Sequence, residues 1–201
     1  MRVPKMMSRT VLCLLLVLST LPLLSSSAHP SSICKTGGEM YGYYVDCNNH
    51  QASASFTWNT DIPNSVVAVD YPYRQAMTSG AGKWSGTVTI SNTSTSSNNG
   101  KISTYSDPST STLAVFTEYS SDSNGHLTSW KIKFNKSKMD SFTAAEKATV
   151  AAHELGHAIG LNDLYLGANS DKLMYGFWPM ASSPTAKDKE GAKEATKASP
   201  I

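Results

Sequence analysis

The sequence predicts an α+β fold, in which a small mixed sheet carries two main helices on one side and a cleft separates it from a short, mostly irregular C-terminal subdomain. Three observations support this prediction. Short segments between residues 55 and 135 alternate polar and apolar side chains, as half-buried strands do. Helical spacing of apolar residues occurs at residues 66–84 and again at residues 144–159. From residue 163 to about residue 185 the chain has neither pattern.

Residues 1–28 have the features of a secretory signal peptide. Basic residues near the N-terminus form a positive n-region, residues 11–24 form an apolar segment, and Ser-Ser-Ala at residues 26–28 offers a cleavage site. The apolar segment is too short for a comfortable membrane span. We therefore expect a secreted, extracellular protein that begins near His29 and has no membrane contact after cleavage. An uncleaved N-terminal anchor is the alternative.

The composition suits an extracellular globular protein better than one that binds nucleic acid. The 201 residues include 17 Lys and Arg against 15 Asp and Glu, a formal charge of +2. Several of these cations lie in the n-region, so the exported chain is near neutral and gives no support to nucleic acid binding. The length fits one domain, which we place at residues 55–201, after an N-terminal segment at residues 29–54. We expect a monomer.

Two cysteines, Cys34 and Cys47, remain after export, because Cys13 leaves with the signal segment. In an oxidising compartment such a close pair most simply forms one disulfide. Closing this short loop stabilises the fold by about 3 kcal/mol in the chain-entropy model. We therefore predict a Cys34–Cys47 disulfide, with free thiols as one alternative.

The first predicted elements are a strand at residues 55–59, with Phe56 and Trp58 on one face, and a helix within residues 66–84. Pro72 lies inside the second segment. The helix therefore either starts there, with Pro in its first turn, or is kinked there. The core positions of this helix have near-helical spacing: Val66, Val69, Tyr73, Met77 and Trp84.

Four further strands are predicted, at residues 87–91, 101–105, 112–119 and 127–135. The last two form the clearest pair. Trp130, Ile132 and Phe134 alternate with polar residues in the second of them, which indicates one buried face. The dipeptide Asn124-Gly125 between the two strands is a strong turn signal.

A long helix is expected from near Ala144 to near Ile159. Thr143 and Glu146 have the spacing of a capping box at its start. One face carries the core residues Ala148, Ala152, Leu155 and Ile159. Another face presents Val150, His153, Glu154 and His157 toward the predicted cleft.

His153 and His157 on this helix form a candidate metal site. Residues four apart on an α-helix lie about 40° apart around the axis and about 6 Å apart along it, so two imidazoles there can chelate one ion. Glu154 lies beside that ion without being a ligand, close enough to act as a general base. This is the arrangement of the HExxH zinc motif.

A catalytic zinc site normally has a third protein ligand. If the helix continued to Asp163, that residue would be too far along and around the axis to reach the ion. Gly160 resolves this, since Gly at a helix C-terminus readily takes φ > 0 and turns the chain back. We therefore predict His153, His157 and Asp163 as ligands of one Zn²⁺. The rival histidines show no ligand spacing and are expected to be solvent-exposed: His29, His50 and His126.

The segment HELGHAIGLND at residues 153–163, followed by LMYG at residues 173–176, resembles the metzincin clan of zinc endopeptidases. The flanks are similar to matrixins, whereas Asp as third ligand is similar to snapalysin-type enzymes. The resemblance implies a peptidase acting on a protein or peptide substrate, with Glu154 as base and Met174 as an apolar floor below the metal. A carboxylate ligand lowers the charge of the site, which makes the metal a weaker Lewis acid than three His would.

The resemblance also assigns residues to the substrate cleft. The strand at residues 112–119 corresponds to the sheet edge along which an extended substrate lies, and residues 177–180 correspond to a wall of the pocket beyond the scissile bond. Tyr165 is a tentative catalytic residue that would donate a hydrogen bond to the tetrahedral intermediate. Tyr175 is a second candidate, and packing is the alternative role for both.

The remaining segments add few functional signals. Thr185 and Asp188 predict the cap of a short C-terminal helix from about Ala186, frayed at Gly191. Two glycosylation sequons begin at Asn92 and Asn135. A cysteine thiolate that caps the zinc, as in latent matrixins, is a further alternative to the disulfide, although the flanking residues do not match that switch sequence. A structural Ca²⁺ site is not indicated.

Two other functions are compatible with the sequence. One is a secreted zinc-containing binding module without turnover, and the other is a structural, β-rich extracellular domain in which the HExxH pattern is accidental. Glu154 next to the first His favours the peptidase, because zinc binding alone requires no base there. The sequence therefore predicts a secreted zinc metalloendopeptidase.

Overall fold

The structure, a computed structural model, describes residues 35–60, 67–93 and 100–197. The predicted signal segment, His29 and Cys34 lie outside these residues. Cys47 takes part in a disulfide, and its pairing with Cys34 stays a prediction. None of the described helices is long and apolar enough to cross a membrane.

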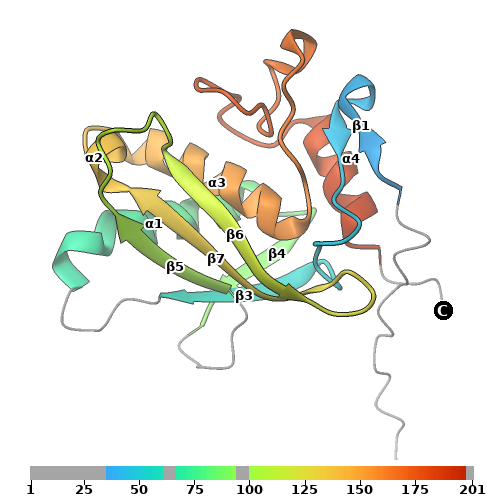
Figure 1. The fold of residues 1–201 in the computed structure, drawn as a ribbon, viewed down its shortest axis with the longest axis horizontal. Coiled ribbons are helices and arrows are strands. Elements are labelled where there is room, and N and C mark those ends of the chain that lie inside the picture. Colours follow the sequence, from blue (N-terminus) through green and yellow to red (C-terminus); the bar gives the residue numbers. More distant parts are fainter. Residues whose placement is uncertain (1–34, 61–66, 94–99, 198–201) are drawn as a thin grey trace, which may run out of the picture.

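A five-stranded mixed sheet forms the centre of the α+β fold (Figure 1), in the order β4-β3-β5-β7-β6. Four strands run parallel, namely β3 (Ser55–Thr60), β4 (Thr89–Asn92), β5 (Gly100–Tyr105) and β7 (Leu127–Asn135). The fifth, β6 (Ala114–Ser121), pairs antiparallel with β7 and lies at a sheet edge. The five predicted strands are therefore confirmed, with small shifts at their ends.

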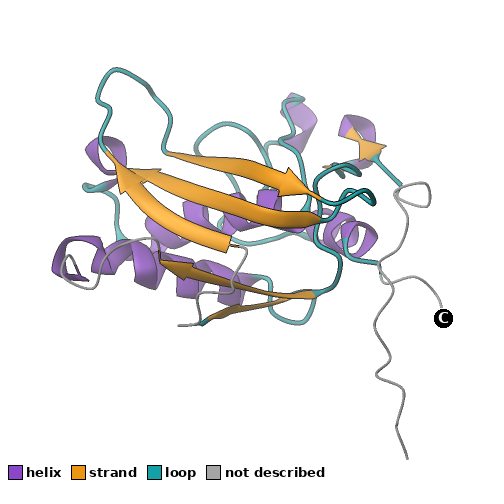
Figure 2. Cartoon of the chain, turned by 60° about the horizontal axis from the view of Figure 1, so that its bottom comes forward, coloured by secondary structure: helices purple, strands orange, loops and turns teal. Residues whose placement is uncertain are grey.

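Two long helices, α1 (Val67–Lys83) and α3 (Ala144–Ile159), pack together on one face of the sheet (Figure 2). The bounds of α3 are those that the capping box and Gly160 predict. The shorter elements are β1 (Gly37–Gly38), the 3-10 helix η2 (Glu39–Tyr41), β2 (Tyr43–Tyr44), α2 (Lys136–Met139), the 3-10 helix η4 (Gly167–Asn169) and α4 (Ala186–Ala195).

The helix α1 packs through residues that its spacing predicts as core. Tyr73, Met77 and Trp84 are buried, and the indole N–H of Trp84 donates to the carbonyl of Ala152 in α3 at 2.9 Å. Pro72 lies inside α1, so the helix passes through this residue and does not start there. The side chains of the other two predicted core positions, Val66 and Val69, are not among those described.

Replacement by Ala should have opposite effects on stability at Gly80 and at Gly82, two glycines near the end of α1. A Cβ on Gly80 would lie 2.8 Å from the backbone N of Ala152, whereas a Cβ on Gly82 would meet no atom within 4 Å. We expect Gly80→Ala to lower the free energy of unfolding by about 1–3 kcal/mol, as overpacking does. Gly82→Ala should raise it by about 0.4–1 kcal/mol, because Ala loses less backbone entropy on folding. Denaturant unfolding measures both, and equal effects would contradict the close approach of the two helices.

The N-terminal segment packs against the end of α3. Val45 is fully buried and forms an isolated antiparallel bridge with Leu161. The backbone N–H of Asp46 donates to the carbonyl of Gly160 at 2.8 Å. The described part of this segment therefore belongs to the same folded unit as α3.

The expectation that His50 and His126 are solvent-exposed is wrong. Their exposed fractions are 0% and 3%, and their ring centroids lie 4.9 Å apart, edge to face. The N–H of His50 donates to Gly125 O at 3.0 Å and the N–H of Leu127 donates to His50 O at 2.7 Å. These bonds bring the N-terminal segment onto the turn between β6 and β7. Both rings are buried because of this long-range contact, which no local pattern reveals.

The helix α4 begins at the predicted capping box of Thr185 and Asp188. It then continues through Gly191, so the predicted fraying at that residue is wrong. A Cβ on Gly191 would lie 2.8 Å from the Cβ of Tyr43 and 2.9 Å from the Cδ2 of Leu161. The glycine therefore allows α4 to pack closely against the N-terminal segment and the chain after α3.

Asn135, the first residue of one sequon, is fully buried. Its side-chain amide donates to Asp107 O at 2.8 Å and to Thr112 O at 3.0 Å, and its side-chain carbonyl accepts the N–H of Asp107 at 2.9 Å. The folded chain thus leaves no room at Asn135 for a glycan. Asn92, in the other sequon, is exposed at the end of β4.

Candidate metal site and cleft

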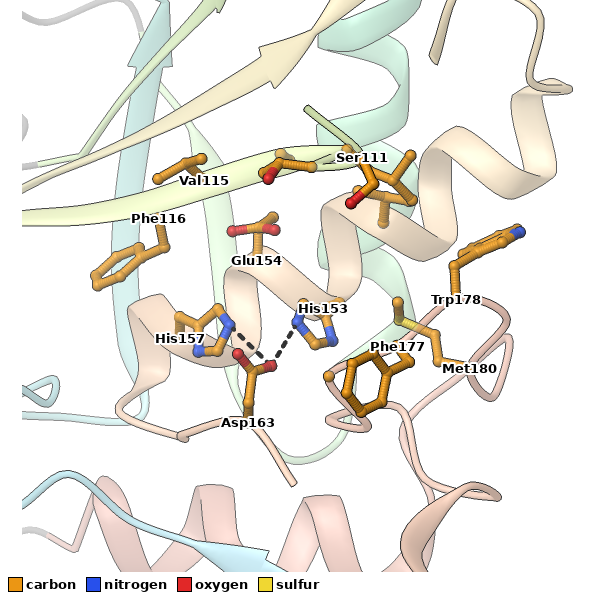
Figure 3. Close-up of a pocket in the computed structure, with 15 residues that line it drawn as sticks. Ser111, Val115, Phe116, His153, Glu154, His157, Asp163, Phe177, Trp178 and Met180 are labelled. Atoms are coloured by element: carbon orange, nitrogen blue, oxygen red, sulfur yellow. Dashed lines mark ion pairs between the residues drawn. The ribbon is translucent and has the colours of Figure 1, made fainter. Parts of the chain in front are cut away.

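A cleft of about 680 Å³ lies beside the edge strand of the sheet (Figure 3). Residues 111–116, in β6 and just before it, form one wall. The opposite wall consists of Gly176, Phe177, Trp178 and Met180. Between the walls lie Val150, His153, Glu154 and His157 of α3, together with Asp163. All four residues predicted to carry the metal and the base therefore line one cavity.

Backbone carbonyls fix the orientation of both imidazoles. Nδ1 of His153 lies 2.8 Å from Leu173 O, and Nδ1 of His157 lies 2.7 Å from Leu161 O. A carbonyl can only accept a hydrogen bond, so each Nδ1 carries a proton and donates it. In a neutral imidazole this leaves the lone pair on Nε2, the atom that then binds a metal.

Gly160 ends α3 with a φ of 120°, which confirms the predicted positive φ. Its N–H still donates to the carbonyls of Gly156 and His157, at 3.2 and 3.0 Å. A Cβ on Gly160 would lie only 2.3 Å from the Cβ of His50, so both the backbone angle and the close contact require glycine. The chain then reverses and brings Asp163 back toward the helix.

Asp163 lies directly opposite the two imidazoles. Its Oδ1 is 3.0 Å from Nε2 of His153 and 3.5 Å from Nε2 of His157 (Figure 3). Because each imidazole donates its Nδ1 proton to a backbone carbonyl, the lone pairs of the two Nε2 atoms point toward the lone pairs of Oδ1. This arrangement is unfavourable unless a cation lies among the three atoms. A proton is one such cation: burial lowers the pKa of His157, but hydrogen bonding to Asp163 and the charge of that carboxylate raise it to about 9. Burial raises the pKa of Asp163, but hydrogen bonds from His153 and His157 outweigh it and hold that pKa well below its usual range.

A metal ion is the other cation that this set of donors fits. The three candidate ligand atoms lie within 4.8 Å of one another. Two imidazole nitrogens and one carboxylate oxygen match a catalytic zinc site with three protein ligands and an open position. Within residues 35–60, 67–93 and 100–197 no other group of three or more His, Cys, Asp or Glu converges in this way. His50 and His126 are therefore not part of the candidate site.

Glu154 lies between the two histidines and β6 (Figure 3). Its carboxylate accepts the backbone N–H of Phe116, while its Oε2 is buried and has no hydrogen-bond partner among the described residues. Burial raises the pKa of Glu154, an effect that the charges of His157 and His153 partly offset. A buried carboxylate with one open acceptor is suited to taking a proton from water in the cleft.

Met174 supports the turn of α3 that carries the two histidines. It is 1% exposed, and a Cβ on Gly156 would lie 2.2 Å from its sulfur. The buried carboxylate of Asp188 accepts the N–H groups of Leu173 and Met174 at 3.1 and 3.2 Å. This contact ties the segment around Met174 to the start of α4. The predicted position of Met174 below a metal stays a prediction.

The two tyrosine candidates occupy different places. The hydroxyl of Tyr165 donates to Oδ2 of Asp163 at 3.0 Å, and the Asp163 charge raises the pKa of Tyr165. Its role as a donor to a reaction intermediate stays a prediction. The ring of Tyr175 lies 5.5 Å from that of Phe177. Neither tyrosine is among the residues that line the cleft.

Some groups that shape the site were not identified from the sequence. Leu161 and Leu173 contribute backbone carbonyls, which any residue type supplies, so no sequence pattern marks them. Glu39 accepts the backbone N–H groups of Tyr165 and Leu166 from a segment 126 residues earlier than Tyr165. A lone Glu in an N-terminal segment carries no signal of such a contact.

Neither a protein-family model nor a curated protein matches the chain. The resemblance to metzincins therefore rests on the motif residues alone. His153, Glu154, His157 and Asp163 meet in one cleft.

Proposed function

We propose that this chain is a secreted, zinc-dependent metalloendopeptidase of the metzincin type. The observation that carries the proposal is the convergence of two imidazole nitrogens and one carboxylate oxygen in a cleft that also holds the Glu154 carboxylate. An α+β architecture with an edge strand beside the cleft supports the same proposal. Secretion rests on the signal-peptide pattern of residues 1–28.

In this proposal His153, His157 and Asp163 hold one Zn²⁺. The hydrogen bonds from both Nδ1 atoms to backbone carbonyls support this assignment, because such outer contacts select the tautomer and fix the ring of a metal-binding His. When bound, zinc supplies a Lewis acid that polarises a carbonyl group and makes water more acidic. The Asp163 carboxylate lowers the net charge of the site relative to three His ligands.

Glu154 moves the proton in the proposed hydrolysis. The water oxygen bonds to the scissile carbonyl carbon while Glu154 accepts the water proton, for which its buried Oε2 is open. Glu154 then gives this proton to the amine nitrogen as the C–N bond breaks, which restores the carboxylate. Burial raises the pKa of Glu154, so the protonated form that the second step needs is more accessible than on an exposed Glu.

An extended peptide is the substrate class that best fits the cleft. Among the described strands β6 pairs only with β7, and an edge strand offers backbone groups for strand addition to a peptide. The opposite wall is apolar, with Phe177, Trp178 and Met180. We therefore expect unfolded protein substrates and a preference for apolar side chains next to the scissile bond.

Hydrolysis of casein by the purified chain from His29 tests the proposed function. We expect cleavage with added zinc, inhibition by excess zinc chelator, and recovery when zinc is restored. Protein that holds one zinc but cleaves neither casein nor apolar peptides would favour a zinc-containing binding module. Protein that stays metal-free at saturating zinc would overturn the proposal and favour a structural domain.

A further inference from the structure

The carboxylate of Glu39 binds the loop that follows Asp163. Its Oε1 accepts the N–H of Tyr165 at 2.7 Å, and its Oε2 accepts the N–H of Leu166 at 3.0 Å. The side-chain amide of Asn169 donates to the same Oε2 at 2.9 Å and to the backbone carbonyl of Glu39 at 3.0 Å. One carboxylate therefore collects three N–H donors from this loop.

The ionised form of Glu39 suits these contacts. Burial raises the pKa of Glu39, but the backbone N–H groups of Leu166 and Tyr165 and the amide of Asn169 outweigh it and lower that pKa. Hydrogen bonds between N–H donors and a carboxylate are stronger than those between neutral groups. The loop is thus held by charge-assisted bonds to a side chain outside it.

The same N-terminal segment holds the chain just before Asp163. The N–H of Asp46 donates to Gly160 O at 2.8 Å, and the N–H of Asn162 donates to Tyr44 O at 2.8 Å. Together with the contacts after it, these bonds fix the backbone on both sides of Asp163. A ligand held in this way loses less conformational freedom when it binds a metal.

Tyr165 connects the Glu39 contact to the carboxylate of Asp163. The backbone N–H of Tyr165 donates to Glu39, while its hydroxyl donates to Oδ2 of Asp163 at 3.0 Å. Oδ1 of Asp163 is the oxygen that faces the two imidazoles. The ring of Tyr165 is confined by Gly176, where an added Cβ would lie 2.5 Å from ring carbon Cε1.

From these contacts we propose that Glu39 is a positioning residue for the third metal ligand, so that the N-terminal segment sets the metal affinity of the site. The proposal rests on the metal site of the proposed function. Loss of an outer-shell contact typically weakens metal affinity about 10–100-fold. If Glu39 only stabilised the loop, its replacement would change thermal unfolding and leave zinc affinity unchanged.

Zinc affinity of Glu39→Gln, in the chain from His29, tests the proposal. Gln has the same size but turns an NH₂ group toward N–H groups that need an acceptor. We expect the Zn²⁺ dissociation constant, measured by competition with a chromophoric chelator, to rise about 10–100-fold. Asp171→Asn is the matched control, since Asp171 follows the same loop, is 72% exposed and pairs with Lys172. It removes the same charge and should change the constant by less than about twofold.

Two further measurements separate positioning from loop stability. In an Asp163→Asn background, Glu39→Gln should cause no further loss of zinc affinity, because the positioned carboxylate is already gone. The visible spectrum of Co²⁺-loaded protein should change in Glu39→Gln and match the wild type in Asp171→Asn. If Glu39→Gln does not fold, Tyr165→Phe tests the same link, because it keeps the ring and removes only the hydroxyl contact with Asp163.

An unchanged Zn²⁺ dissociation constant in the folded Glu39→Gln protein overturns the role of Glu39. The role is also overturned if Glu39→Gln weakens zinc binding equally in the wild-type and Asp163→Asn backgrounds. If Glu39→Gln does not fold, an unchanged Zn²⁺ dissociation constant in Tyr165→Phe overturns the role of Glu39. Each of these three results would leave the zinc peptidase itself intact. Wild-type protein that binds no zinc would instead overturn the metal site, and the positioning role with it.

Discussion

Replacement of Glu154 by Gln is expected to lower kcat for peptide hydrolysis by about 10²–10⁴-fold, the range for loss of a general base. Gln has almost the same shape but does not accept a proton at neutral pH. The N–H of Phe116 that binds Glu154 can bind the amide oxygen instead. Zinc content and thermal unfolding should therefore stay as in the wild type. Steady-state hydrolysis and metal analysis of one preparation measure both.

Glu190→Gln provides the control for removal of an acidic side chain. Glu190 lies on α4, its side chain is 48% exposed, and it pairs with Lys187 at 2.7 Å, so kcat should not change. Turnover near the wild-type value in Glu154→Gln would exclude Glu154 as the base. Loss of zinc together with loss of activity would instead mean that Glu154 binds the metal or supports its ligands.

Replacement of Asp163 by Asn should weaken zinc binding by more than about 100-fold, beyond the effect typical of outer-shell residues. The variant keeps the side-chain shape but removes the one anionic ligand of the proposed set. The variant should also lower the pKa of His157. Burial lowers the pKa of His157, and Asp163 is the main group that raises it, so the variant should lose the His157 proton at lower pH than the wild type. Chelator competition and NMR titration of the metal-free protein measure the two changes.

Asp171→Asn serves again as the control for a lost surface charge, and it should change neither the zinc affinity nor the pKa of His157. Wild-type zinc affinity in Asp163→Asn would exclude Asp163 as the third ligand. A lower zinc affinity with an unchanged His157 pKa would contradict the direct contact between the two side chains.

The helix that carries the motif could be predicted from local residues. The capping box of Thr143 and Glu146 marks its start, and Gly160 with positive φ marks its end. Both signals depend on a few adjacent residues and on backbone geometry that only certain side chains allow. Helix geometry also places His153 and His157, four residues apart, on one face.

The strands were predictable, but their order was not. Alternation at residues 127–135 indicates a strand with one buried face, and β7 has the same bounds. Nothing in that alternation tells which strands are its neighbours. The exposure predicted for His50 and His126 was wrong for the same reason: the segments that cover each ring come from distant parts of the chain.

The sequence by itself determined which residues have the chemistry and spacing of a zinc hydrolase, namely His153, Glu154, His157 and Asp163. Only the tertiary structure decided which carbonyls orient the imidazoles and which carboxylate holds the loop after Asp163. Spacing within one helix follows from helix geometry and can be read from the residue numbers. The contact between Glu39 and Tyr165 joins positions 126 residues apart. It forms because the N-terminal segment folds back onto the chain around Asp163, through bonds such as Asn162 N–H to Tyr44 O, so no local pattern encodes it.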